Sequence, residues 1–174
     1  MNNNQDAAQS PSGKSNTKKL LPLSELLPPE RIELNVKVNN WQEAICKAGK
    51  LLFNSGAVTG GYIDAMIKLA EDLGPYIVIA PGIALPHAAT EAGAKQTALS
   101  LIKLSDPIYF GNPDNDPVTL VFALSAIDNK VHILALQALA ELFLSKDLVN
   151  QLFKAESVDS VIETFHQAEE RVNQ

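Results

Sequence analysis

Residues 116–126, with the sequence DPVTLVFALSA, form a nearly continuous apolar run, and this run limits the fold more than any other segment. A strand with one solvated face shows alternating apolar and polar residues, whereas a continuous run is typical of a strand that is covered on both faces. Helices that pack on each side of a sheet provide such a cover. The run therefore predicts an α/β fold in which a central sheet lies between helices.

Several other segments carry apolar residues at the helical period of about 3.6, each on one face only. The first predicted helix begins at Asn40, which can cap it, and Glu43 stands in the reciprocal position of a capping box. The second helix follows Thr59 and stops at Gly74 and Pro75. Because each helix has a single apolar face, each is expected to pack against the sheet. Three later helices are expected to begin after the capping residues Asp128, Ser145 and Ser157.

The remaining apolar segments predict the other strands. Together with residues 116–126 they give a mixed β-sheet of about five strands, sandwiched between helices. Residues 1–18 are rich in Asn, Gln, Ser, Ala and Gly without periodicity, and we interpret them as a disordered tail that precedes one domain at 19–170. The other predicted strands lie at residues 31–34, 76–80, 96–104 and 107–110.

Composition narrows the class of protein. Hydrophobic residues make up 46% and charged residues 20% of the 174 residues, which is enough for a sizeable core. No apolar run has the length of a membrane span, and the first residues do not resemble a secretory signal. A single cysteine, Cys46, excludes an internal disulfide and is expected to be a buried thiol. These features together predict a cytoplasmic protein.

The charge pattern argues against a nucleic-acid partner. The net charge is −6, and the basic residues are scattered and include only two arginines, Arg31 and Arg171. A protein that binds nucleic acid normally concentrates lysine and arginine on one face. We therefore look for function in individual residues rather than in a basic surface.

The strongest candidate residue is His87, which follows an apolar, strand-like segment in the sequence GPYIVIAPGIALPHAAT. Pro86 makes the backbone before the histidine stiff, and the small residues Ala88 and Ala89 leave room beside it. An imidazole has an ordinary pKa near 6.5, so part of it is neutral and nucleophilic at the pH of the cell. The pattern thus favours a histidine that accepts a bulky anionic group such as phosphoryl. A turn histidine that hydrogen-bonds a backbone carbonyl remains the alternative.

A second histidine, His132, falls in the first turn of the helix that follows the long strand. Strand ends and helix N-termini meet at the edge where α/β proteins place their sites, and free backbone N–H groups there favour an anion. If His87 lies at a neighbouring strand end, the two imidazoles can meet. A half-buried packing role for His132 stays open. His166 lies on the polar side of the last helix and is expected to be solvated.

Two blocks of the sequence carry a resemblance to a known family. The segment GPYIVIAPGIALPHA resembles the phosphorylation-site segment of the mannitol/fructose-type IIA proteins of the bacterial sugar phosphotransferase system (PTS), and it is most similar to the ascorbate-specific members. The later segment DNDPVTLVFALSAIDNKVHILALQALAELF resembles the part of the same family that carries a strand, a loop with a second histidine, and a helix. The resemblance covers roughly residues 20–168.

The resemblance implies a phosphocarrier, a phosphotransferase component without a cofactor or a metal. It implies that His87 accepts a phosphoryl group from the phosphohistidine of the carrier protein HPr and passes it to a cysteine of an enzyme IIB. That partner then phosphorylates a carbohydrate, here ascorbate-like, during its uptake through the membrane enzyme IIC. His132 matches the second histidine, which stabilises the phosphoryl group. A homodimer is compatible with the resemblance.

The sequence departs from the family at two positions. Ala89 stands where the ascorbate-type proteins usually have an arginine, and Lys68 is the cation that the second helix offers in place of the mannitol-type arginine. Cations normally offset the charge of a phosphoryl group, which is about −2. Helix N-terminal amides and His132 are therefore expected to take over this role.

Two other classes of function remain as alternatives. A regulatory IIA-like protein would use its phosphorylation state to control partner proteins, and the missing arginine is compatible with that. A metal-dependent hydrolase would use the two histidines as ligands, but the sequence has no H-E-x-x-H motif or clustered carboxylates beside them.

Overall fold

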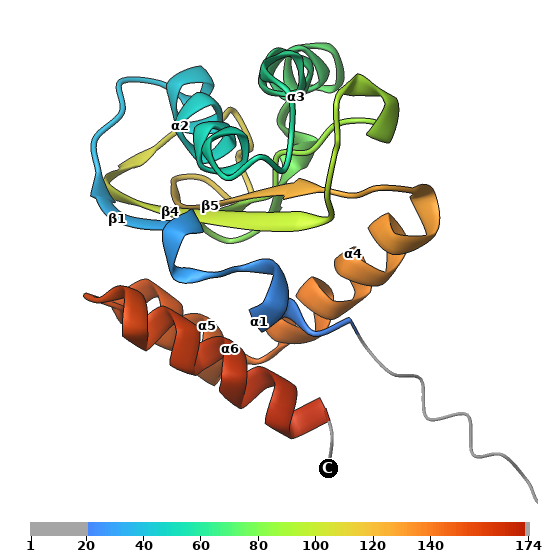
Figure 1. Ribbon diagram of the computed structural model, residues 1–174. Helices are drawn as coiled ribbons and strands as arrows, with labels where there is room; N and C mark the ends of the chain where they lie inside the picture. Colours follow the sequence, from blue (N-terminus) through green and yellow to red (C-terminus); the bar gives the residue numbers. More distant parts are fainter. Residues whose placement is uncertain (1–20, 173–174) are drawn as a thin grey trace, which may run out of the picture.

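A five-stranded mixed sheet forms the centre of the protein, which a computed structural model describes for residues 21–172 (Figure 1). The strand order is β1-β4-β5-β3-β2. β1 runs parallel to β4 and β3 runs parallel to β5, whereas the pairs β4–β5 and β2–β3 are antiparallel. The strands are β1 (Ile32–Val36), β2 (Val78–Ala80), β3 (Ile83–Ala84), β4 (Ala98–Ile108) and β5 (Val118–Ser125).

The long strand β5 lies near the middle of this sheet and is covered on both faces, as its apolar run predicts. Val121 and Ala123 face one hydrophobic core, and Phe122 and Leu124 face the other. All four side chains are 0% exposed. The expected sheet between helices is therefore confirmed.

Helices form a layer on each side of the sheet (Figure 1). α2 and α3 cover one face, and α1, α4, α5 and α6 lie on the other. Within residues 21–172, none of these helices combines the length and apolarity needed to cross a membrane. The helices are α1 (Leu23–Leu26), α2 (Trp41–Asn54), α3 (Gly60–Leu73), α4 (Asn129–Leu144), α5 (Lys146–Lys154) and α6 (Val158–Val172), and short 3₁₀ turns lie at Pro29–Arg31, Pro75–Ile77 and Thr90–Ala92.

Side-chain caps start several of these helices where the sequence predicts them. Asn40 accepts a hydrogen bond from the backbone N–H of Glu43 at 2.8 Å, and Asp128 accepts one from Val131 at 2.8 Å. In a capping box the carboxylate of Glu43 would accept from the N–H of Asn40. Here it accepts from the N–H of Asn39, one residue earlier, at 2.9 Å. The caps therefore fix where α2 and α4 begin.

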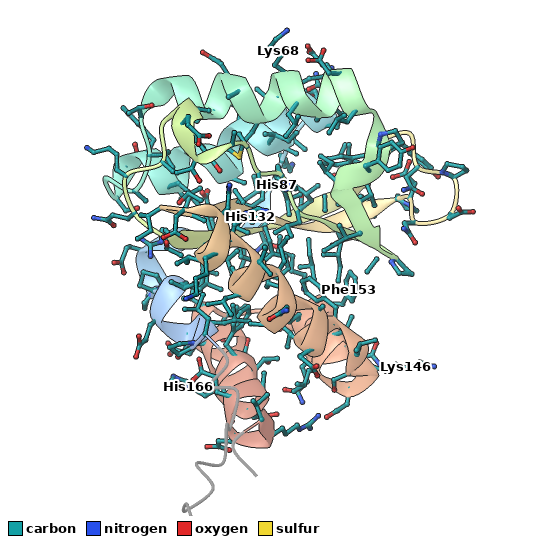
Figure 2. The ribbon with its side chains drawn as sticks, turned by 90° about the vertical axis from the view of Figure 1, so that its right-hand side faces the viewer. Lys68, His87, His132, Lys146, Phe153 and His166 are labelled. Carbon is teal, nitrogen blue, oxygen red and sulfur yellow. The ribbon has the colours of Figure 1, made fainter. Side chains whose placement is uncertain are left out.

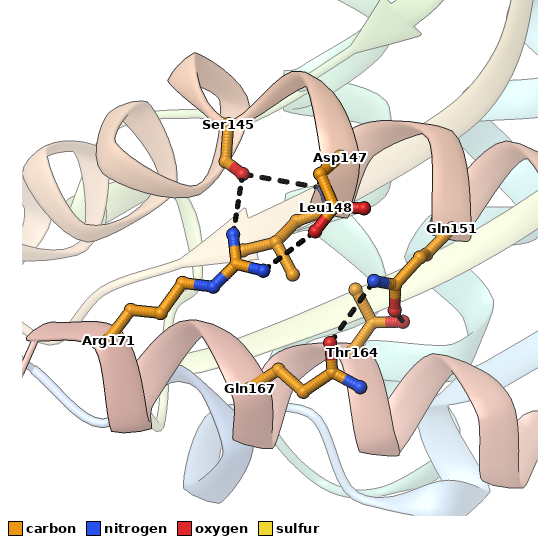
Figure 3. A network of polar contacts seen from close by, with 7 residues as sticks. All are labelled: Ser145, Asp147, Leu148, Gln151, Thr164, Gln167 and Arg171. Atoms are coloured by element: carbon orange, nitrogen blue, oxygen red, sulfur yellow. Dashed lines mark hydrogen bonds and ion pairs between the residues drawn. The ribbon is translucent and has the colours of Figure 1, made fainter.

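A polar network joins α5 to α6 on the side of the sheet that faces away from α3 (Figure 3). Arg171 donates to Asp147 at 2.7 Å and to the hydroxyl of Ser145 at 3.0 Å. The Arg171 guanidinium lowers the pKa of the exposed Asp147 carboxyl. Further along, the hydroxyl of Thr164 lies 3.2 Å from the amide oxygen of Gln151. Together these contacts link α6 to α5.

Three expectations about the elements need correction. The predicted strands 96–104 and 107–110 are one strand, β4, because Ile108 still pairs with Val118 of β5 after an irregularity in the register. The predicted strand 76–80 is shorter, since a 3₁₀ turn occupies Pro75–Ile77. A separate strand, β3, follows the turn at Gly82 and was not expected. The predicted tail, residues 1–18, lies outside the described residues.

Candidate functional site

Two parallel strands bring the candidate histidines to one edge of the sheet (Figure 2). β3 pairs with β5 in parallel, and both strands end at the same edge. His87 follows β3 by three residues, and β5 leads into the first turn of α4, which carries His132. The sequence-based expectation that the two imidazoles meet therefore agrees with the geometry.

The backbone on each side of His87 is tied to the chain that leads from β5 to α4. The N–H of Leu124 donates to the carbonyl of Pro86 at 3.1 Å, so His87 pairs with Leu124 as an isolated parallel bridge. After the histidine, the hydroxyl of Thr90 donates to the carbonyl of Ala126 at 3.0 Å. These contacts hold the loop of His87 beside the start of α4.

The two imidazole rings face each other at short range. Their centroids are 5.2 Å apart and their planes differ by 45°. Both rings are half-buried. A group bound to one ring nitrogen of His87 would thus lie close to His132.

A backbone contact selects which nitrogen of His87 can react. Its Nδ1 lies 2.8 Å from the carbonyl oxygen of Leu85. A carbonyl oxygen can only accept, so Nδ1 must carry the proton and donate it. In the neutral ring, Nε2 then has no proton and keeps its lone pair. A hydrogen bond to a backbone carbonyl is the feature expected of the alternative, a structural turn histidine. Here the same bond also leaves the other nitrogen, Nε2, available as a nucleophile.

His132 is held mainly in its neutral form. Burial lowers the pKa of His132, and the neighbouring His87 lowers it further. A neutral imidazole avoids charge repulsion with its partner ring, yet it can take up a proton when an anion arrives. The arrangement therefore suits an anionic group that binds to His87 beside His132.

The other singled-out polar residues lie away from the histidine pair. Lys68 is 77% exposed on α3, pairs with Asp72 at 3.7 Å and points away from His87 (Figure 2). His166 is 58% exposed on α6, and its ring lies 3.9 Å from Glu169. Cys46 is half-buried rather than fully buried. Of the three histidines, only His87 and His132 come together.

Ala89 is exposed in the loop after His87, where the family pattern would place an arginine. In the first turn of α4, the N–H groups of Val131 and His132 already donate to Asp128, which leaves those of Asn129 and Lys130 for an anion at the helix N-terminus. Among residues 21–172, no group of three or more His, Cys, Asp or Glu side chains could hold a metal ion.

A cavity between α1, α4, α5 and α6 lies away from the histidines. It has a volume of about 460 Å³, and Leu142, Phe165 and Arg171 line it. Neither histidine is among the lining residues.

Sequence reasoning missed one residue under the loop. Tyr62 of α3 is 1% exposed, and its hydroxyl touches the backbone of Ala88 and of Leu124. It lies on the same buried face of α3 as Met66 and Ala70. A tyrosine in an apolar stripe is the signal that could have identified it, because a buried phenol needs a hydrogen-bond partner.

The sequence of residues 25–168 matches the family model described as phosphoenolpyruvate-dependent sugar phosphotransferase system, EIIA 2. The mannitol-specific cryptic phosphotransferase enzyme IIA component of Escherichia coli (strain K12) is 39% identical over 136 residues, which are 78% of this chain and 91% of that protein. The ascorbate-specific PTS system EIIA component of Salmonella typhimurium is 41% identical over 101 residues, which are 58% of this chain and 66% of that protein.

Solved structures show the same architecture. The solution structure of the mannitol-specific cryptic enzyme IIA from Escherichia coli has a TM-score of 0.77 and 35% identity, with 84% of this chain and 99% of that one covered. A complex of enzyme IIA(Mtl) with phosphorylated enzyme IIB(Mtl) from Escherichia coli has a TM-score of 0.71 and 28% identity, with 79% and 95% covered.

Proposed function

Because the chain belongs to the EIIA 2 family of the phosphoenolpyruvate-dependent sugar phosphotransferase system, we propose that it is a cytoplasmic phosphocarrier whose nucleophile is His87. It takes a phosphoryl group from the phosphohistidine of HPr and passes it to a cysteine of an enzyme IIB. That enzyme phosphorylates a carbohydrate during uptake through the membrane enzyme IIC. No cofactor takes part in either step.

The observation that carries this proposal is that the contact of Nδ1 with Leu85 leaves Nε2 unprotonated, on a ring whose centroid lies 5.2 Å from that of His132. The proton on Nδ1 is held by the carbonyl of Leu85 at 2.8 Å, so Nε2 can attack phosphorus in line. A bond forms between Nε2 and phosphorus while the bond from phosphorus to the HPr nitrogen breaks. In the second step, the thiolate of the IIB cysteine attacks, a sulfur–phosphorus bond forms, and the bond to Nε2 breaks.

His132 has the complementary role in this proposal. Its ring lies 5.2 Å from that of His87, centroid to centroid. A phosphoryl group carries a charge of about −2 and raises the pKa of a neighbouring imidazole. His132 can therefore become a cation and donate to a phosphoryl oxygen, together with the N–H groups at the start of α4. These donors would offset the negative charge of the phosphoryl group, which Ala89 cannot do because its side chain is uncharged.

The relatives support the proposed acceptor, and they include proteins named for two different carbohydrates. A structural neighbour is a complex of enzyme IIA(Mtl) with phosphorylated enzyme IIB(Mtl), which supports an enzyme IIB as the acceptor here. Relatives are named for mannitol and for ascorbate at similar identity. We propose an ascorbate-like carbohydrate, because the phosphorylation-site segment resembles the ascorbate-specific members.

Intact-mass spectrometry after incubation with phosphoenolpyruvate, enzyme I and HPr tests the proposal. We expect one acid-labile phosphoryl adduct on the wild type and on His166→Ala, and none on His87→Ala. His166→Ala is the matched control, because it removes an exposed histidine from α6. His132→Ala should form the adduct more slowly, on the order of a hundredfold, because it removes a group that stabilises transferred charge.

Addition of a purified enzyme IIB gives the second arm of the test. Loss of the adduct from the carrier and its appearance on the IIB cysteine would support transport. An adduct on His87→Ala would overturn the assignment of the nucleophile. An adduct on the wild type that no enzyme IIB accepts would favour the regulatory alternative.

A further inference from the structure

The hydroxyl of Tyr62 joins two backbone segments that are far apart in the sequence. It donates to the carbonyl of Leu124 at 2.7 Å and accepts from the N–H of Ala88 at 3.1 Å. These partners lie 62 and 26 residues from Tyr62. Ala88 immediately follows His87, and Leu124 is near the end of β5, which leads to the helix of His132.

The hydroxyl of Tyr62 takes the place of the next backbone hydrogen bond between the His87 segment and β5. In a parallel pair, the bond from Leu124 N–H to the Pro86 carbonyl would be followed by a bond from Ala88 N–H to the Leu124 carbonyl. The Tyr62 hydroxyl bridges those two groups instead. Directly after His87, the backbone is therefore joined to β5 through the side chain of Tyr62. This holds the segment in place at the point where it separates from β5.

Packing alone does not call for this hydroxyl. Tyr62 is 1% exposed within the core on the α3 side, where a phenylalanine ring would bury the same carbon surface. A buried phenol without partners is costly, whereas this one satisfies two backbone groups at once. Burial also raises the pKa of Tyr62, which keeps the hydroxyl protonated and able to donate.

We propose that Tyr62 is a positioning residue that holds the imidazole of His87 with Nε2 free and directed at His132. It acts on the backbone directly after the histidine, while Leu85 fixes Nδ1 and Pro86 fixes the backbone directly before it. Its effect on phosphoryl transfer rests on the function proposed above. Its effect on the ring of His87 does not.

The substitution Tyr62→Phe tests the proposal, because it removes only the bridging oxygen. The matched control is Thr164→Val, which also removes a buried hydroxyl. Thr164 is 1% exposed and lies on α6, beyond the opposite face of the sheet. Both variants are expected to lower the free energy of unfolding to a similar extent, because each removes a buried hydroxyl that is hydrogen-bonded to backbone groups. Only Tyr62→Phe is expected to affect His87.

Two measurements separate positioning from stability. Nitrogen-15 spectra of the imidazole of His87 should show one neutral tautomer, protonated at Nδ1, in the wild type and in Thr164→Val, and a mixture in Tyr62→Phe. The rate constant of phosphorylation at saturating phospho-HPr should fall on the order of tenfold in Tyr62→Phe alone, because a displaced nucleophile loses its alignment. The concentration of phospho-HPr at half-maximal rate should not change.

Unchanged ring signals in Tyr62→Phe, or an unchanged rate constant in a protein that accepts phosphoryl, would overturn the proposal. If the wild type accepts no phosphoryl group, the proposed function fails, and the ring signals still decide the role of Tyr62. If Tyr62→Phe does not fold, hydrogen exchange in the wild type provides the test. The amide of Ala88 should then be protected relative to that of the exposed Ala89, and equal exchange at both would contradict the bridge.

Discussion

The Nδ1 atom of His87 lies 2.8 Å from the carbonyl oxygen of Leu85, two residues earlier in the chain. The contact is local, and Pro86 between the two residues limits how the backbone can move. It fixes the tautomer, because the carbonyl accepts only from a protonated nitrogen. When a group is added to Nε2, positive charge develops on the ring, and this hydrogen bond becomes charge-assisted and stronger.

This geometry predicts that phosphorylation occurs at Nε2 of His87 and not at Nδ1. The measurement is a nitrogen–phosphorus correlation spectrum of the phosphorylated protein, which identifies the bonded nitrogen. The correlation should link phosphorus to Nε2, while Nδ1 keeps its proton. Phosphorus bound to Nδ1 would mean that the contact with Leu85 breaks before transfer and does not prepare the nucleophile.

The lowered pKa of His132 predicts a pH dependence of stability. In the unfolded chain the histidine has its ordinary pKa of about 6.5, so it binds a proton more readily than in the folded protein. The unfolded state therefore gains protons first as the pH falls. The free energy of unfolding should decrease as the pH falls through about 6.5, and this decrease should end below the pKa of the folded state.

Urea unfolding from about pH 7.5 to about pH 5.5 checks this dependence against His132→Gln, which cannot titrate in this range. As the pH falls, the free energy of unfolding of the wild type should decrease relative to that of His132→Gln. His166→Gln serves as the control, since its ring is exposed on α6. A wild type that loses no more stability than His132→Gln would contradict a half-buried His132 that is held neutral.

The central part of the fold could be predicted because its signals are local. A few consecutive apolar residues in β5 are enough to indicate that both faces of this strand are covered. The caps Asn40 and Asp128 accept hydrogen bonds from residues only three positions away. The proximity of His87 and His132 was expected only on the condition that His87 lies at a neighbouring strand end, from the rule that α/β proteins place their sites where strand ends and helix N-termini gather.

What the sequence did not reveal depends on distant partners. β4 was divided because exposed polar residues, Ser105 and Asp106, interrupt its apolar pattern, yet pairing with β5 carries the strand past them. β3 has two residues and forms because β5 lies beside it. The partners of Tyr62 are carbonyl and amide groups 62 and 26 residues away, so the local pattern indicates only that its buried hydroxyl needs partners and not which groups these are.

A last prediction concerns Gly93, which closes the loop that follows His87. Its φ is +134°, a conformation that other residues rarely adopt. A Cβ atom there would overlap the hydroxyl of Thr59 and lie 3.4 Å from Cβ of Tyr62. The carbonyl of Gly93 also accepts from the N–H of Thr59 at 2.9 Å, so the loop cannot simply move away.

Gly93→Ala should therefore lower the free energy of unfolding by about 3 kcal/mol, as backbone strain and steric overlap add. The matched control is Gly56→Ala, where φ is +78° and no atom lies within 4 Å of the new Cβ, so that strain acts alone and should cost about 1 to 2 kcal/mol. Chemical denaturation of both variants gives the comparison. Gly93→Ala should also slow phosphorylation of His87, because the displaced loop weakens the bond between Thr90 and Ala126, whereas Gly56→Ala should not. Equal losses of stability in the two variants would show that the contact with Thr59 relaxes at no cost, and the loop would then not depend on a glycine at this position.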